Sequence, residues 1–239
     1  MSLLSSIESN GFAICPSLVD AQTMGQLIDS VESIDRSEAT RARGTAVFAV
    51  RNLLAENETV RAVARSRAIL DVVESILGRP AFAVRAIWFD KTPDANWKVP
   101  WHQDLSIAVK EKIDVPGFGP WSNKLGLVHV QPPAQVLQRM ITVRLHLDDC
   151  NEANGPLKVI AGSHAHGAMK QEQLDAWRER NESTLCTVEK GGAVLMRPMI
   201  LHASSPASVP GHRRVLHIEY SSDELPGGLK WQDRVGDDR

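Results

Sequence analysis

The sequence has few of the features that mark disulfide-rich or membrane proteins. Its three cysteines, Cys15, Cys150 and Cys186, are far apart and form no CxxC pair. An odd number of isolated cysteines is typical of reduced thiols, buried or unused, in a cytosolic protein; a catalytic or metal-bound cysteine is the alternative. No apolar run approaches the roughly 18 residues that a membrane-spanning helix needs, so we expect no membrane partner.

The sequence also has no large excess of positive or negative charge. The 27 Lys and Arg residues nearly balance the 29 Asp and Glu residues, so nothing indicates a nucleic-acid surface or a polybasic membrane patch. The opening MSLLSSIESNG has no basic segment followed by an apolar core, so we expect no secretory signal and a cytoplasmic location. With 43% hydrophobic and 23% charged residues, the 239-residue chain has the composition of a globular protein.

The expected elements divide the chain into a helical first third and a β-rich remainder. A short strand at 11–16 precedes helical periodicity at 17–34, which Ser17 or Asp20 could cap, and at about 57–78. Strand-like runs follow at 81–90 and at about 99–109, 126–130, 140–148, 156–160, 185–189, 193–197 and 213–220. Many short strands without alternating helices predict a sandwich or jelly roll, and not a parallel α/β sheet.

We expect one domain over residues 1–239, with a helical part at about 1–80, a β-rich core at about 81–222 and a polar tail at 223–239. The segment 105–139 is the least regular part, with PGFGPW and two consecutive prolines. A long irregular segment of this kind is either a lid over a site or an ordinary surface insertion. The polar tail is expected to be mobile unless Trp231 anchors it.

The segment PWHQDLS, residues 100–106, places His102 and Asp104 two positions apart. On a strand these side chains point to the same face. His202 follows the apolar run AVLMRPMIL, where a buried strand would end at an interior cavity. Two histidines and one carboxylate can occupy one face of an octahedral ion, which is the ligand set of non-haem Fe(II) oxygenases. The alternative is a His-Asp pair that only stabilises a loop.

Other interpretations of a metal site have less support in the sequence. His164 and His166 in GSHAHG have the same spacing as the first pair, but a solvent-side turn flanked by glycines also explains them. Two histidines and an aspartate could instead hold the zinc ion of a hydrolase. We find no convincing general base nearby for that chemistry.

An anionic co-substrate would need a cation. The run HRRVLHIEY, residues 212–220, offers Arg213 and Arg214 on opposite faces of a strand, and the pattern does not say which one points inward. Lys91 could meet an acidic group of the co-substrate or substrate, or be solvated. Trp97 lies just before the metal strand, where a core or pocket-wall position is expected.

Polar residues alternate with apolar ones in ITVRLHLDD. Thr142, Arg144 and His146 therefore share one face, which either lines the pocket or faces solvent. Gln103 points away from the metal on a regular strand and could still contact neighbouring ligands. We assign Thr142 and Lys91 to the co-substrate. We assign Trp97, Gln103, Arg144 and His146 to the substrate.

Three segments together resemble the phytanoyl-CoA dioxygenase family, a branch of the Fe(II)/2-oxoglutarate dioxygenases. They are WHQD, LDDCNEANGPLKVIAGSH (147–164) and LHASSPASVPGHRRVLHIEY (201–220), and the resemblance covers about residues 11–220. It implies a double-stranded β-helix, or jelly roll, braced by N-terminal helices. It also implies that His102, Asp104 and His202 are the catalytic iron ligands. Asn154 and Gly155 match a turn of the family, for which we expect a structural role.

The same resemblance selects Arg213, with Ser204, as the binding residues for the distal carboxylate of 2-oxoglutarate. It implies an enzyme that uses Fe(II), 2-oxoglutarate and O₂ to hydroxylate an unactivated C–H bond of a small molecule, with release of succinate and CO₂. Because Asp104 is present, the chain lacks the substitution typical of iron halogenases. The alternatives are an acyl-CoA hydroxylase, for which the sequence shows no obvious basic cluster, and a non-catalytic metal-binding jelly roll.

Overall fold

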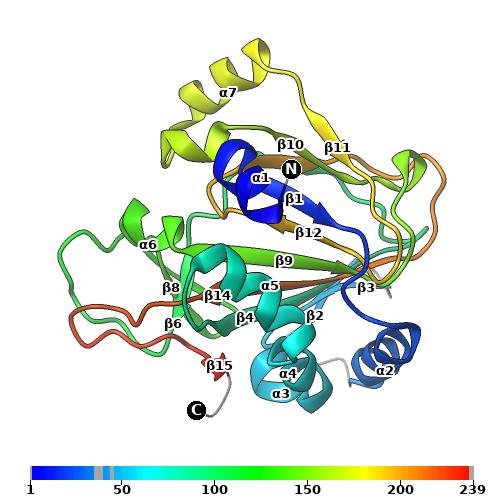
Figure 1. Ribbon diagram of the computed structural model, residues 1–239, viewed down its shortest axis with the longest axis horizontal. Coiled ribbons are helices and arrows are strands. Elements are labelled where there is room, and N and C mark those ends of the chain that lie inside the picture. Colours follow the sequence, from blue (N-terminus) through cyan, green and yellow to red (C-terminus); the bar gives the residue numbers. More distant parts are fainter. Residues whose placement is uncertain (1, 35–39, 44–45, 237–239) are drawn as a thin grey trace.

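The structure is a computed structural model that describes residues 2–34, 40–43 and 46–236, and antiparallel sheets dominate it (Figure 1). The largest sheet has eight strands. Its order is β1 (Phe12–Cys15), β12 (Ala193–Met196), β9 (Met140–His146), β14 (Arg213–Ser221), β4 (Phe82–Lys91), β3 (Ala46–Val50) and β2 (Thr40–Arg43), and β15 (Val235–Gly236) also pairs with β4. The second sheet has the order β11 (Thr184–Cys186), β10 (Leu157–Ile160), β13 (Leu201–Ser204) and β5 (Val99–His102). The third sheet is β6 (Ile107–Val109), β8 (Leu127–Val130) and β7 (Trp121–Lys124).

Most helices precede the β-rich part of the chain, as the sequence predicts. They are α1 (Leu3–Asn10), α2 (Ala21–Glu32), α3 (Leu53–Glu56), α4 (Glu58–Ala64) and α5 (Arg67–Leu77), followed later by α6 (Ala134–Gln138) and α7 (Gln171–Arg180). Two 3₁₀ turns lie at Glu152–Asn154 and Ser163–His166. Helices α4 and α5 cover one face of the large sheet, and α7 projects away from the other helices (Figure 1). Among the described residues, no helix is both long and apolar enough to cross a lipid bilayer.

Local chemistry explains where the helices begin and end. The Asp20 carboxylate accepts a hydrogen bond from the Thr23 amide at 2.8 Å and caps α2. The single helix predicted at 57–78 is two helices, because the chain turns at Arg65 and Ser66. Gly78 ends α5 with φ of 72°, a left-handed conformation that glycine adopts without strain.

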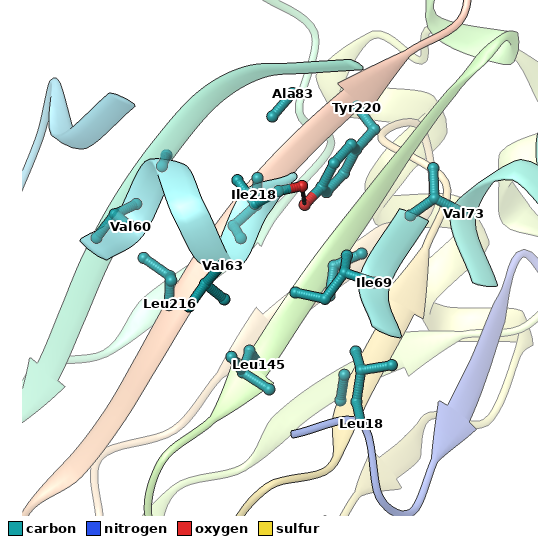
Figure 2. Close-up of a cluster of buried hydrophobic side chains, with 14 of the residues drawn as sticks. Leu18, Val60, Val63, Ile69, Val73, Ala83, Leu145, Leu216, Ile218 and Tyr220 are labelled. Carbon is teal, nitrogen blue, oxygen red and sulfur yellow. Dashed lines mark hydrogen bonds between the residues drawn. The ribbon is translucent and has the colours of Figure 1, made fainter. Parts of the chain in front are cut away.

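The main hydrophobic core lies between the large sheet and the helices. Leu216, Ile218 and Tyr220 alternate along β14 toward α4 and α5, and Ile69 of α5 packs among them (Figure 2). The Tyr220 hydroxyl donates a hydrogen bond to the Ala64 carbonyl at the end of α4, at 2.9 Å. This core fixes β14 on its outer face, so that the residues between, on the inner face, turn toward the second sheet.

The segment 105–139 is better ordered than its sequence indicates. It contains the three strands of the small sheet and α6, and its apolar side chains form a cluster with Trp231, Leu229 and Leu225 of the C-terminal segment. Trp231 is 3% exposed and forms a β-bridge with Val109. The described part of the tail is therefore packed, with Trp231 as its anchor. Whether 105–139 acts as a lid stays a prediction.

Four helices, α1, α3, α6 and α7, have no counterpart among the predicted elements. The two longer ones, α1 and α7, each bury one side chain, Ile7 and Leu174. A helix with one buried side chain has no apolar period, and the period is the signal on which the prediction depends. The hairpin of β2 and β3 was also not predicted.

Candidate active site

A cavity of about 450 Å³ lies between the two larger sheets. The inner faces of β4, β9 and β14 form one wall, with Phe89, Arg144 and Arg213 among the lining residues. The strands β5, β10 and β13 of the second sheet form the opposite wall, where His102 and His202 lie. The cavity thus collects side chains that are far apart in sequence, from Arg51 to Glu219.

His102, Asp104 and His202 meet at this cavity. His102 ends β5 and is the cross-strand partner of His202 on β13. One ligand atom from each of the three residues lies within 4.8 Å of the others. The His102 Nε2 atom is 3.7 Å from one Asp104 oxygen, and the His202 Nε2 atom is 3.5 Å from the other. The sequence-distant histidine therefore joins the pair as the sequence analysis expected.

The backbone orients both imidazole rings. The Nδ1 atom of His102 is 2.8 Å from the Pro100 carbonyl, and the Nδ1 atom of His202 is 2.9 Å from the Ile200 carbonyl. Since carbonyls only accept, each Nδ1 carries the proton and each Nε2 presents a lone pair toward Asp104. This tautomer is the one that can bind a metal through Nε2.

The charge states of these groups also suit a cation. Burial lowers the pKa of His202 to about 4, so the ring is neutral at neutral pH. For Asp104, burial acts to raise the pKa, but the nearby His202, His217 and His102 outweigh it and lower the pKa to about 2. A neutral His202 ring and an ionised Asp104 carboxylate are both in the form that binds a divalent metal.

Gln103 lies between the two metal-facing residues but points elsewhere. Its Nε2 donates to the carbonyls of Gly167, at 2.8 Å, and Met199, at 2.6 Å. Its Oε1 accepts from the Met169 amide at 2.8 Å. These contacts connect β5 to the turn before β13 and to the loop after the second 3₁₀ turn. Three backbone groups therefore already bind the Gln103 side-chain amide. The contact between Gln103 and the substrate stays a prediction.

Three buried cations lie in or next to the cavity: Arg144 and Arg213 line it, and Lys91 does not line it but is the cross-strand partner of Arg213. Lys91 is 1% exposed, Arg213 is 2% exposed and Arg144 is 8% exposed. The Arg213 guanidinium donates to the Gly155 carbonyl at 2.9 Å, and the Lys91 ammonium donates to the Ser204 hydroxyl at 3.1 Å and to the Ser205 carbonyl. Within the described part of the chain, these three side chains form no ion pair with a carboxylate.

The two neighbouring arginines on β14 differ completely in their surroundings. Arg213 lines the cavity and is the cross-strand partner of Lys91. Arg214 points to the other side, where it forms ion pairs with Asp148 at 2.7 Å and Glu32 at 3.0 Å. The pattern left this choice open, and the geometry places Arg213 inside.

The buried cations influence one another's protonation. Burial, and next the charge of Arg213, lower the pKa of Lys91 to about 7. Burial, and next Arg213, also lower the pKa of Arg144, to about 10. A group of mutually repelling, unpaired cations in a low-dielectric cavity is costly unless an anion joins it.

The other predicted polar residues take different positions. Trp97 lines the cavity, with its ring 5.7 Å from the Lys91 ammonium. Thr142 and His146 are on the same face of β9 as Arg144 but are buried at 0% and 1% exposure and do not line the cavity. The face thus points inward, and only its central residue reaches the cavity.

His164 and His166 lie outside the cavity. The His164 ring packs under Gly11, and the His166 ring stacks on Trp177 with ring centroids 4.1 Å apart. Neither belongs to a group of potential metal ligands in the described residues.

Several cavity residues were not singled out from the sequence. His217 and Glu219 of β14 line the cavity with Arg85 of β4, and Arg51 and Lys124 are also among the lining residues. The sequence contained a signal for His217 and Glu219, because strand alternation places them on the same face of β14 as Arg213. Arg51 and Lys124 come from separate segments, and no local pattern connects them to the site.

Comparisons with known proteins agree with this geometry. The family model described as "Phytanoyl-CoA dioxygenase (PhyH)" matches residues 7–215. A curated relative, the L-proline trans-4-hydroxylase of Streptomyces griseoviridis, is 25% identical over 229 residues, which cover 84% of this chain and 78% of the relative.

Solved structures are similar over almost the whole chain. AviO1 from Streptomyces viridochromogenes Tue57 is 18% identical, with a TM-score of 0.70 and coverage of 94% of this chain and 96% of that one. The epimerase SnoN, solved in complex with Fe³⁺, alpha ketoglutarate and nogalamycin RO, is 15% identical, with a TM-score of 0.69 and coverage of 98% and 93%. The predicted jelly-roll fold with added helices is confirmed.

Proposed function

The chain belongs to the phytanoyl-CoA dioxygenase family and is an Fe(II)- and 2-oxoglutarate-dependent oxygenase, and we propose that it hydroxylates a small organic acid in the cavity between its two larger sheets. The observation that carries this proposal is the coexistence, in one cavity, of a potential metal-ligand group and two buried arginines, Arg144 and Arg213, that form no ion pair with a carboxylate of the described residues. A metal ion would bind to the ligand group, and an organic dianion would pair with the buried cations.

We assign the iron to His102, Asp104 and His202. The fit rests on three features: the close approach of the ligand atoms, the free Nε2 lone pairs and the ionised carboxylate. Three ligands on one side of the ion leave positions for other molecules. Bound Fe(II) would supply the activation of O₂, coupled to the oxidative decarboxylation of 2-oxoglutarate to succinate and CO₂.

The distal carboxylate of 2-oxoglutarate would bind Arg213, with Ser204 and Lys91 beside it. Arg213 offers a planar guanidinium in the cavity lining, and the Gly155 carbonyl holds one of its N–H groups. The Lys91 ammonium is already oriented by the Ser204 hydroxyl. A carboxylate at this place would pair with the buried charge of Arg213 and favour the charged form of Lys91, which makes its binding favourable despite desolvation.

The substrate would share the cavity with the co-substrate. Besides Arg144 and Arg213, the lining includes Arg51, Arg85 and Lys124, against the carboxylates of Asp104 and Glu219, so it is positive overall. A substrate with a carboxylate would complement this charge. The volume of the cavity limits the size of the substrate. Pockets of roughly 300–1,000 Å³ hold drug-sized ligands. Because this cavity of about 450 Å³ must also hold the co-substrate, the substrate is a small molecule. The related protein named for L-proline acts on a molecule of this kind.

An anaerobic titration tests the metal and co-substrate assignment. Fe(II) followed by 2-oxoglutarate, added to metal-free protein, should produce the weak visible absorption band of chelated 2-oxoglutarate. His202→Ala should abolish this band, while His166→Ala, a histidine outside the cavity, should leave it unchanged. Binding of Fe(II) without a band in the unmodified protein would refute the co-substrate assignment.

A substrate screen with matched pairs tests the organic-acid proposal. Small carboxylic acids, including L-proline and other amino acids, are compared with their uncharged amides, and succinate release is measured. We expect acids to stimulate succinate release and the corresponding amides to be inactive. Stimulation by neutral compounds alone would show that the cations that line the cavity do not select the substrate.

A further inference from the structure

Arg144 occupies the centre of the cavity wall. It lies on β9, where its cross-strand partner on β14 is His217. Its guanidinium is 5.8 Å from the centre of the Phe89 ring, and its Nη1 atom is 2.9 Å from His217 Nδ1. The strands around it are anchored from outside by the main core, so the side chain has a defined direction.

The charge of Arg144 lacks a partner. A guanidinium carries five N–H donors. In Arg144 one of them contacts His217, and the buried Nε–H has no hydrogen-bond partner. No carboxylate of the described residues forms an ion pair with it. An unpaired buried guanidinium aimed at a cavity is a strong indication of an anionic ligand.

The residues beside Arg144 hold it in place. The Arg144 Nη1–H donates to His217 Nδ1, so the proton of a neutral His217 is on Nε2. That Nε2 is 3.3 Å from a Glu219 oxygen, and the same carboxylate oxygen is 3.1 Å from Arg85. The chain of contacts from Arg85 through Glu219 and His217 fixes one nitrogen of Arg144, and the side chain lines the cavity.

Arg144 shares its cavity with both ends of the site. Its cross-strand partner His217 is four residues after Arg213 on β14, so the two arginines are two inward-facing positions apart along this part of the sheet. The three residues of the metal group line the same cavity. A molecule that extends from the metal group to Arg213 therefore lies in the cavity that Arg144 lines.

We propose that Arg144 is a second carboxylate-binding residue for 2-oxoglutarate, which holds the carboxylate at the metal end while Arg213 holds the distal one. This inference rests on the proposed function of the cavity. His217 and Glu219 are positioning residues in this arrangement, because they contact Arg144 and orient it. Each carboxylate of the co-substrate then has a guanidinium of its own.

A comparison of two ligands distinguishes the two ends. 2-Oxovalerate has the same 2-oxo acid end as 2-oxoglutarate but lacks the distal carboxylate. Affinities of both ligands are measured anaerobically by calorimetry on the Fe(II)-loaded protein. Arg144→Leu should weaken both ligands by a similar factor, about 10- to 100-fold, as expected for loss of a charge-assisted hydrogen bond. Arg213→Leu should weaken 2-oxoglutarate and leave 2-oxovalerate unchanged.

Matched variants keep the test decisive. Arg144→Lys keeps the charge and should recover part of the lost affinity. Arg144→Gln keeps a donor for His217 and serves in place of Arg144→Leu if that variant does not fold. Fe(II) affinity should be the same in all of them, because Arg144 is not assigned as a metal ligand.

The outcomes separate this inference from the function itself. Unchanged affinity of Arg144→Leu for both ligands would overturn the inference and leave Arg144 to the substrate. Weakened binding of 2-oxoglutarate alone would also overturn it, because Arg144 would then act at the distal end. If the unmodified protein does not bind 2-oxoglutarate, the proposed function fails instead.

Discussion

At the level of single residues, the backbone decides which atom of a side chain is available for chemistry. His102 and His202 each use Nδ1 on a carbonyl two residues earlier in the chain, so both present Nε2 to Asp104. Gln103 illustrates the reverse case, because backbone groups occupy its whole amide. Residue type alone does not distinguish these situations.

Replacement of Gln103 should loosen the metal group without removing a ligand. In Gln103→Leu, the Gly167 and Met199 carbonyls and the Met169 amide lose their partner, which should cost on the order of 2 kcal/mol or more of the free energy of unfolding. We also expect weaker Fe(II) binding, since the turn before β13 is released. Urea unfolding and Fe(II) titration measure both effects.

The exposed Gln171→Leu on α7 is the matched control for Gln103→Leu, and its free energy of unfolding should change by less than about 0.5 kcal/mol. Normal Fe(II) affinity in Gln103→Leu would show that this amide does not position the ligands.

Lys91 should make 2-oxoglutarate binding dependent on pH. Its folded-state pKa is about 7, below the usual 10.5 of lysine. A bound carboxylate favours the charged amine, so binding above pH 7 requires uptake of a proton and weakens as pH rises. Below pH 7 the amine is already charged and the affinity should be nearly constant. Calorimetry in buffers of different ionisation enthalpy measures the proton uptake.

In Lys91→Met, the pH dependence above pH 7 should disappear, and the affinity at pH 6 should be lower than in the unmodified protein. A variant with the same slope as the unmodified protein would assign the proton to another group.

At the level of elements, β14 shows how one strand serves two environments. Arg213, His217 and Glu219 face the cavity, while Leu216 and Tyr220 face the helices. Alternation along the strand therefore separates the residues that hold the fold from those that line the site. Mutations on the two faces should have separable effects.

Tyr220→Phe tests this separation. The variant loses the hydrogen bond from the hydroxyl to the Ala64 carbonyl and leaves that carbonyl without a side-chain donor. We expect a loss of about 1–2 kcal/mol in the free energy of unfolding. The affinity for 2-oxoglutarate should not change, because Tyr220 points away from the cavity. A changed affinity with unchanged stability would reverse this division of roles.

The turn at Gly155, just before β10, contacts residues of the site. Gly155 has φ of 73°, and its carbonyl accepts from Arg213. A Cβ atom there would lie 2.5 Å from the Ser205 carbonyl oxygen and 3.0 Å from the Lys91 ammonium. Gly155→Ala should therefore displace Lys91 and weaken 2-oxoglutarate binding. Gly126→Ala has a similar positive φ but open space around it, and should lower stability without affecting the ligand.

At the level of the whole molecule, the two ends of the β-rich part support each other. The C-terminal segment pairs with β6 through Val109 and Trp231, and both residues belong to one apolar cluster with the segment 105–139. That segment begins directly beside Asp104. The tail therefore stabilises the part of the chain next to the metal group.

Trp231→Ala should expose this segment. Removing a buried tryptophan typically costs about 3–5 kcal/mol, and here we expect the cost to appear as local opening of 105–139. Limited proteolysis should cut this segment faster in the variant, while the core strands β9 and β14 stay protected. Equal cleavage rates would show that 105–139 is stable without the tail.

Much of the fold was accessible from the sequence because its signals are local. The alternation in β9 and β14, the strand-like run of β4 and the glycine stop at Gly78 indicated element types directly. Helices α1 and α7 were missed because each buries one residue, and the C-terminal segment looked mobile because its anchoring partner is more than a hundred residues away.

The sequence by itself determined the kind of protein and the set of chemical groups. The spacing of His102 and Asp104, the apolar run before His202 and the motifs of the family require no knowledge of distant contacts. Only the tertiary structure decided which groups share the cavity: Arg144 lines it and pairs with no carboxylate of the described residues, while Thr142 and His146 on the same face of β9 do not reach it. Burial and pairing of a charge depend on residues from several strands, and no local pattern contains that information.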